Sequence, residues 1–188
     1  MTRRDLPNLI SILRIMLVIP VTLLLWQARF DEALYLFAIA GFSDALDGYL
    51  AKRYGWTSWL GGLLDPLADK LLLVASYFTL GWLGFLPVWL VVAVLARDVI
   101  IVAGATAYHF WVARLEADPT LLSKLNTLAQ IVLVLAVVFD EVMHASLQPF
   151  ILALIYSVAA TTLLSGGMYV FSWSRRAWRV SRQDKDSA

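Results

Sequence analysis

Two neighbouring stretches place four aspartates inside the most apolar part of the chain: residues 42–53 read FSDALDGYLAKR, and residues 61–70 read GGLLDPLADK. Asp44 and Asp47 are three residues apart and Asp65 and Asp69 are four apart, so each pair falls on one helix face. A carboxylate at the centre of a membrane helix costs roughly 2.5–3.5 kcal/mol, so four of them need a partner that offsets this cost. Two facing helices would collect the four carboxylates in one small volume, where they cannot all stay ionised without a cation.

The available ligand atoms indicate which cation this is. Carboxylate oxygens without sulfur or imidazole favour Mg²⁺, Mn²⁺ or Ca²⁺ over zinc. The chain has no cysteine and only two histidines, His109 and His144, which lie far apart in the sequence. Two divalent cations in a carboxylate cage suit phosphoryl transfer, because they bridge phosphate oxygens and stabilise charge on the attacking and leaving groups. We therefore predict a Mg²⁺ or Mn²⁺ centre, with two ions per site, at Asp44, Asp47, Asp65 and Asp69.

The composition predicts an all-α, polytopic membrane protein. Of the 188 residues 61% are hydrophobic, whereas a soluble domain rarely exceeds about half. Six apolar runs are long enough to span a bilayer, and they cover roughly 9–28, 32–51, 60–81, 86–112, 121–139 and 147–173. We expect these six transmembrane helices to form one domain, residues 1–173, followed by a basic cytoplasmic tail, residues 174–188.

The distribution of lysine and arginine predicts the orientation of the spans. With six spans, one side of the membrane receives the basic termini together with Lys52, Arg53 and Arg114, whereas the other side has only Arg29 among several acidic residues. Both termini are therefore expected in the cytoplasm, with the aspartates in the cytoplasmic half of a bacterial-type inner or plasma membrane.

Small and basic residues surround the aspartates. Gly48, Ala51 and Gly61 would let a ligand approach the backbone closely, and Lys52 with Arg53 could meet a diphosphate at the cytoplasmic interface. The basic residues nearest the same side of the other helices are candidates for a second anion site: Arg14, Lys70, Arg97 and Lys124. For Arg97 the alternative is a structural ion pair within the membrane with its neighbour Asp98.

The spacing of residues 44–69 resembles the signature of the CDP-alcohol phosphatidyltransferases, Asp-x2-Asp-Gly-x2-Ala-Arg-x8-Gly-x3-Asp-x3-Asp. The one departure is Lys52, which stands where the family usually has arginine and is followed at once by Arg53. A lysine can supply charge to a diphosphate, but it lacks the bidentate geometry of a guanidinium.

The resemblance extends along nearly the whole chain. Residues 6–14, LPNLISILR, are similar to the amino-terminal motif of the branch that makes phosphatidylglycerophosphate and cardiolipin. Arg97-Asp98 and residues 123–127, SKLNT, look more like the mitochondrial-type cardiolipin synthases, in which Ser-Lys-x-Asn-Thr opens the fifth helix. The glycerophosphate branch more often has Arg-Glu and Gly-Lys-x-Lys-Thr at these places.

The resemblance implies a role for each matching residue. Asp44, Asp47 and Asp65 correspond to metal ligands, and Asp69 lies beside the metals as the general base for the acceptor hydroxyl. The resemblance assigns CDP-diacylglycerol binding to Asn8, Gly48, Ala51, Lys52 and Gly61. It also implies a homodimer formed through membrane helices and an active site near the cytoplasmic leaflet. Membrane lipids are then both substrates and surroundings, and no nucleic acid is involved.

Two acceptor alcohols remain open within this family. Transfer of the phosphatidyl group to phosphatidylglycerol would give cardiolipin and CMP, and transfer to glycerol 3-phosphate would give phosphatidylglycerophosphate. A phosphomonoester brings about two negative charges and requires several basic partners. Asn126 occupies the position of a lysine in the glycerophosphate-type motif, which favours the lipid acceptor. The acceptor-binding candidates are Arg14, Lys70, Arg97 and Lys124.

Two interpretations come from other classes of protein. Intramembrane carboxylates also line the paths of cation transporters, but the paired halves typical of transporters are not visible in the sequence. An aspartyl intramembrane protease needs two aspartates that share one proton, rather than four in paired helical spacing. Metal-dependent release of CMP would distinguish the transferase from both.

Overall fold

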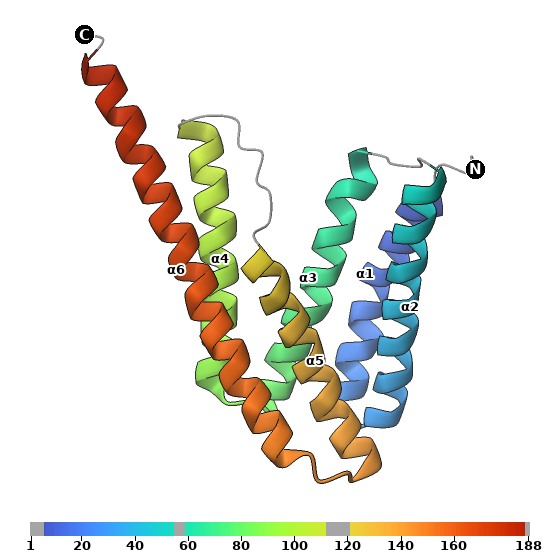
Figure 1. Ribbon diagram of the computed structural model, residues 1–188. Coiled ribbons are helices and arrows are strands. Elements are labelled where there is room, and N and C mark those ends of the chain that lie inside the picture. Colours follow the sequence, from blue (N-terminus) through green and yellow to red (C-terminus); the bar gives the residue numbers. More distant parts are fainter. Residues whose placement is uncertain (1–5, 55–58, 112–120, 187–188) are drawn as a thin grey trace. The chain divides into compact units, whose positions relative to one another are not determined.

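Six α-helices make up the part of the chain that the structure describes. The computed structural model describes the backbone of residues 6–54, 59–111 and 121–186, and the side chains of residues 12–43, 68, 70–104 and 121–169. In chain order the helices are α1 (Leu6–Trp26), α2 (Phe30–Tyr54), α3 (Trp59–Trp82), α4 (Val88–Trp111), α5 (Leu121–Met143) and α6 (Gln148–Asp186) (Figure 1). Each overlaps one of the six predicted apolar runs, so the all-α prediction is confirmed.

Membrane crossing is supported most directly for two of these helices. Within the described residues, Leu121–Met143 and Gln148–Tyr169 are long and apolar enough to span a bilayer. Ile12–Trp26 and Lys70–Trp82 are apolar but shorter. Six spans and cytoplasmic termini stay predictions. The helix α6 continues beyond residue 173 to Asp186, so the tail begins as an extension of the last helix.

The chain divides into two compact units. Unit 1 comprises the described residues up to Pro87 together with Val134–Ile151, and unit 2 comprises Val88–Leu133 with the described residues from Leu152 onward. In unit 1, α1 packs against both α2 and α3. Small side chains allow this close approach, since Ala33, Ala40 and Ala68 are buried there.

Aromatic contacts fix one end of unit 1. The rings of Trp26 and Trp82 stack with centroids 6.1 Å apart, and Phe30 meets Phe85 edge-on at 5.2 Å. Between α3 and α4 the chain turns at Gly84, whose φ of +85° is one that a side chain would strain. These contacts bring the end of α1, the start of α2 and the end of α3 to one level.

The hairpin between α5 and α6 is held by Asp140, also in unit 1. Its carboxylate accepts the backbone N–H of Leu147 at 2.8 Å and the side-chain amide of Gln148 at 3.2 Å. Because the first turn of a helix has unsatisfied N–H groups, a carboxylate close to the start of α6 favours initiation there.

Unit 2 has an unusual distribution of polarity. Its exposed side chains include Val92, Val99, Leu163 and Met168, whereas several of its buried ones are polar or charged. A soluble helical domain would show the reverse arrangement. Apolar residues outside and paired polar residues inside are expected for helices that pack together within lipid.

Candidate functional site

The residues predicted to hold the metals lie on α2 and α3. Asp44 and Asp47 are in α2, and Asp65 and Asp69 are in α3. Their side chains lie outside the described ones, as do those of all the residues assigned to CDP-diacylglycerol: Asn8, Gly48, Ala51, Lys52 and Gly61. The backbone nevertheless fixes how far along the helices the four aspartates lie.

Helical rise places the four aspartates at matching distances from the aromatic end of unit 1. Measured along the helices, Asp44 is 14 residues from Phe30 and Asp69 is 13 from Trp82, or about 20 Å in each case. Asp47 is 17 residues from Phe30 and Asp65 is 17 residues from Trp82, or about 26 Å in each case. Two pairs of carboxylates at matching levels, without thiolate or imidazole, are a donor set that fits hard divalent cations.

Arg14 lies at the same level on α1, the helix that contacts both α2 and α3. It is 12 residues, or about 18 Å, before Trp26, and its side chain is only 1% exposed. A buried guanidinium requires polar partners, and Arg14 makes at least one such interaction. Arg14 is therefore a buried positive charge on α1, the helix that packs against both aspartate-bearing helices.

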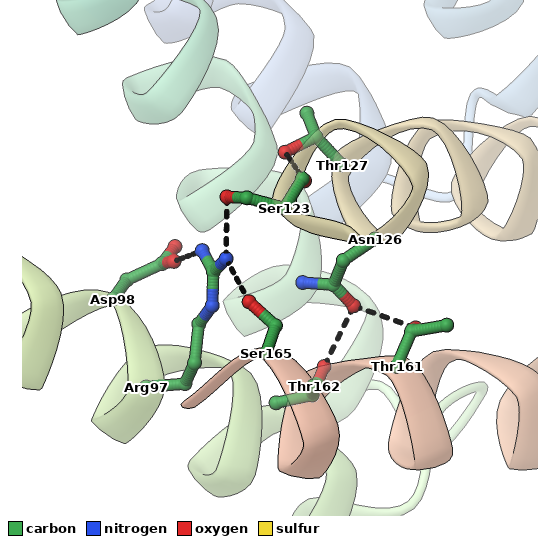
Figure 2. Close-up of polar contacts among 8 residues, drawn as sticks. All are labelled: Arg97, Asp98, Ser123, Asn126, Thr127, Thr161, Thr162 and Ser165. Carbon is green, nitrogen blue, oxygen red and sulfur yellow. Dashed lines mark hydrogen bonds and ion pairs between the residues drawn. The ribbon is translucent and has the colours of Figure 1, made fainter. Parts of the chain in front are cut away.

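Arg97 is the centre of a polar cluster in unit 2 (Figure 2). Its Nη1 donates to the carboxylate of Asp98 at 2.8 Å, and its Nη2 donates to Ser123 Oγ at 2.7 Å and to Ser165 Oγ at 2.6 Å. Arg97 is 5% and Asp98 is 8% exposed. We call these four residues the Arg97 cluster; it joins α4, α5 and α6, and the charge of Arg97 is neutralised within it.

Asn126, one turn after Ser123 on α5, is fully buried against α6. Its Oδ1 accepts the hydroxyl of Thr161 at 2.8 Å and that of Thr162 at 3.0 Å. Figure 2 shows the amide nitrogen pointing away from both threonines. Among the described residues, neither this Nδ2 nor Arg97 Nε meets an acceptor. We call Asn126, Thr161 and Thr162 the α5–α6 clasp.

The two lysines of the predicted acceptor set have different surroundings. Lys124 on α5 is exposed, and it is the one exposed cation among the side chains described in unit 2. Lys70 on α3 is partly exposed, belongs to unit 1 and has a polar or electrostatic partner. For Arg97, the ion pair with Asp98 is the alternative that the sequence left open, whereas Ser123 and Ser165 were not predicted as its partners.

Sequence reasoning missed the α6 residues of this region: Thr161, Thr162 and Ser165. Their signal is a set of small hydroxyl residues at i, i+1 and i+4 within an apolar helix, which is typical of close helix packing in membranes. The same face includes Gly166, where an added Cβ would lie 3.5 Å from Arg97 Cγ.

A family model named CDP-alcohol phosphatidyltransferase matches residues 4–165, most of the chain. The chain belongs to this family. The match covers α1 to α5 and the part of α6 that carries the clasp, and it includes all four aspartates. It agrees with the resemblance found in the aspartate motif, and the family is membrane-associated.

Curated relatives of this family member fall into two groups by name. Cardiolipin synthase (CMP-forming) of Rattus norvegicus is 32% identical over 93% of this chain and 63% of its own length. CDP-diacylglycerol--glycerol-3-phosphate 3-phosphatidyltransferase of Bacillus subtilis is 30% identical over 94% of this chain and 98% of its own length. A cardiolipin synthase of Streptomyces coelicolor is 39% identical over half of this chain and 46% of its own length. The chain thus spans less than two thirds of the rat relative.

Proposed function

We propose that this chain transfers the phosphatidyl group of CDP-diacylglycerol to phosphatidylglycerol, giving cardiolipin and CMP. The observation that carries the choice of acceptor is the ion pair between Arg97 and Asp98. Because it neutralises Arg97, the described part of unit 2 offers one uncompensated exposed cation, Lys124. The phosphodiester of phosphatidylglycerol carries one negative charge, whereas a phosphomonoester carries about 1.5 to 2 at neutral pH.

The position of Asn126 supports the same choice. In the glycerophosphate-type motif this residue is a lysine, which would add a second positive charge. Here it is an amide that is 0% exposed and accepts two threonine hydroxyls from α6. An additional ammonium at this position would have to be buried against α6 at a large desolvation cost.

The division of labour within the site follows from the helices that carry each residue. Asp44, Asp47 and Asp65 would hold two divalent cations, which when bound stabilise charge on the donor diphosphate. Asp69, one turn beyond Asp65 on α3, would take the proton of the acceptor hydroxyl as it attacks phosphorus. The small residues Gly48, Ala51 and Gly61 would leave space for CDP, and Lys52 would pair with its diphosphate.

Glycerol 3-phosphate is the second candidate acceptor, because the Bacillus relative matches this chain along 98% of its own length. Arg14 and Lys70 in unit 1 are the basic residues that a phosphomonoester would use in addition to Lys124. The family match leaves the cation transporter and the aspartyl protease without support.

The test is a turnover assay of purified protein with CDP-diacylglycerol and one acceptor at a time. We expect CMP release and cardiolipin with phosphatidylglycerol, and a much lower rate with glycerol 3-phosphate. Faster turnover with glycerol 3-phosphate would overturn the choice of acceptor, and absence of CMP release with either would overturn the reaction class.

The proposal includes two features that the family resemblance implies. The first is a homodimer formed through membrane helices, which mass measurement in detergent or nanodiscs would test. The second is an active site on the cytoplasmic side of a bacterial-type inner or plasma membrane.

A further inference from the structure

Two levels of polar contact tie α5 to α6 in unit 2, one helical turn apart. At the first, Arg97 Nη2 bridges Ser123 of α5 and Ser165 of α6. At the second, Asn126 Oδ1 accepts the hydroxyls of Thr161 and Thr162. Because the residue number rises along α5 while it falls along α6, these levels belong to an antiparallel helix pair (Figure 2). Both Asn126 and Ser165 are fully buried.

These contacts determine the rotation of α5 about its own axis. The apolar residues around this turn of α5 are mostly leucines, including the exposed Leu121, Leu125 and Leu128. Lipid chains are as apolar as leucine, so burial of these side chains would barely distinguish one rotation from another. Interhelical hydrogen bonds do distinguish them, because rotation would leave buried polar groups without partners.

The rotation in turn determines where Lys124 points. With 3.6 residues per turn, Lys124 lies about 160° around α5 from Asn126. Asn126 is turned to α6, and Lys124 is exposed on the other side of the helix, as this geometry requires. A helix rotated by one residue would move Lys124 by about 100°.

We propose that Asn126, Thr161 and Thr162 are positioning residues for acceptor recognition: the α5–α6 clasp fixes the rotation of α5 and so directs Lys124 to the anionic group of the acceptor. This inference deepens the function proposed above and rests on it. Nothing in the sequence motif assigns a role to the two threonines of α6. The clasp belongs to α5 and α6, whereas the residues predicted to bind the donor belong to α1, α2 and α3.

The kinetic test separates acceptor from donor. Asn126→Leu and the double variant Thr161→Val/Thr162→Val remove the clasp while keeping the side-chain volumes. We expect each change to raise the KM for the acceptor about five- to tenfold and to leave the KM for CDP-diacylglycerol unchanged. A rise of this size corresponds to the loss of two interhelical hydrogen bonds in a membrane. Combining the two changes should add little, because both remove the same contacts.

Matched controls and a rescue variant are available in the same two helices. Thr127 donates to the Ser123 carbonyl of its own helix at 3.2 Å, and Ser157 donates to the Ala153 carbonyl of its own helix at 2.7 Å. Thr127→Val and Ser157→Ala should therefore leave both KM values unchanged. Thr161→Ser/Thr162→Ser keeps both hydroxyls and should restore the acceptor KM. Equal effects in controls and clasp variants, or parallel changes in both KM values, would overturn the proposal.

Thiol labelling tests the rotation independently of activity. The chain has no cysteine, so Lys124→Cys introduces a single reporter. We expect a thiol reagent to modify this cysteine at different rates with and without Asn126→Leu, whereas Thr127→Val should not change the rate. An unchanged rate in the Asn126→Leu background would contradict the proposed control of rotation. If the wild-type protein uses neither acceptor, the proposed function fails. Thiol labelling of Lys124→Cys then decides by itself whether the clasp fixes the rotation of α5.

Discussion

At the scale of single residues, Asp69 carries the most specific chemical prediction. It lies one turn beyond Asp65 on α3, at the level of Asp44 on α2. Asp69→Asn keeps the shape of the side chain but cannot accept a proton from the acceptor hydroxyl. We expect a loss of about 10²-fold or more in rate, with binding of CDP-diacylglycerol retained.

Rate and donor binding must both be measured for Asp69→Asn, because they separate three roles. Near wild-type turnover would make Asp69 a structural carboxylate. Loss of donor binding would make it primarily a metal ligand. Only slow turnover with intact donor binding agrees with a general base.

Arg97 provides a second test at the residue scale, in which stability is measured. Arg97→Met removes the guanidinium from a buried ion pair and takes away the cation that lies 2.8 Å from the Asp98 carboxylate. Breaking a buried pair in this way costs about 3–5 kcal/mol, so the midpoint of thermal unfolding in detergent should fall markedly. Arg97→Met/Asp98→Leu should recover most of that loss. A double variant as unstable as the single one would show that Asp98 is not the partner that matters.

At the scale of helices, the metal prediction depends on α2 and α3 acting together. Each contributes two carboxylates at matching levels, so neither pair alone should retain the ions. Asp44→Ala, Asp47→Ala and Asp65→Ala should each abolish metal-dependent donor binding together with activity. A chelator should stop turnover, and Mg²⁺ or Mn²⁺ should restore it; full turnover in chelator would exclude the two-metal interpretation.

The sequence was a good guide to the helices and a weaker one to their contacts. Apolar runs of spanning length identified all six described helices, because a helix that is to cross lipid needs a long and predominantly apolar sequence. The same uniformity hides which face packs where. Arg97 and Asn126 could be singled out from the sequence. The hydrogen bonds that Ser165, Thr161 and Thr162 make to them are known only from the packing of α6 against α5. Arg97 was predicted to contact the acceptor, and the structure surrounds it with Asp98 and two serines.

At the scale of the whole molecule, the orientation in the membrane remains a prediction from the lysine and arginine distribution. The absence of native cysteine makes the test simple, since a cysteine placed at position 2 or 187 is the only thiol. We expect an impermeant thiol reagent added from outside intact cells to leave both positions unmodified. Modification at either position, before the cells are opened, would show that this terminus is external.

The choice of acceptor is the central claim, and a direct competition tests it most directly. Purified protein receives CDP-diacylglycerol, Mg²⁺ and equal concentrations of isotopically labelled phosphatidylglycerol and glycerol 3-phosphate, and mass spectrometry identifies the labelled lipid products. We predict that labelled cardiolipin predominates and that the two labelled lipid products together equal the CMP released. A predominance of labelled phosphatidylglycerophosphate would contradict this account.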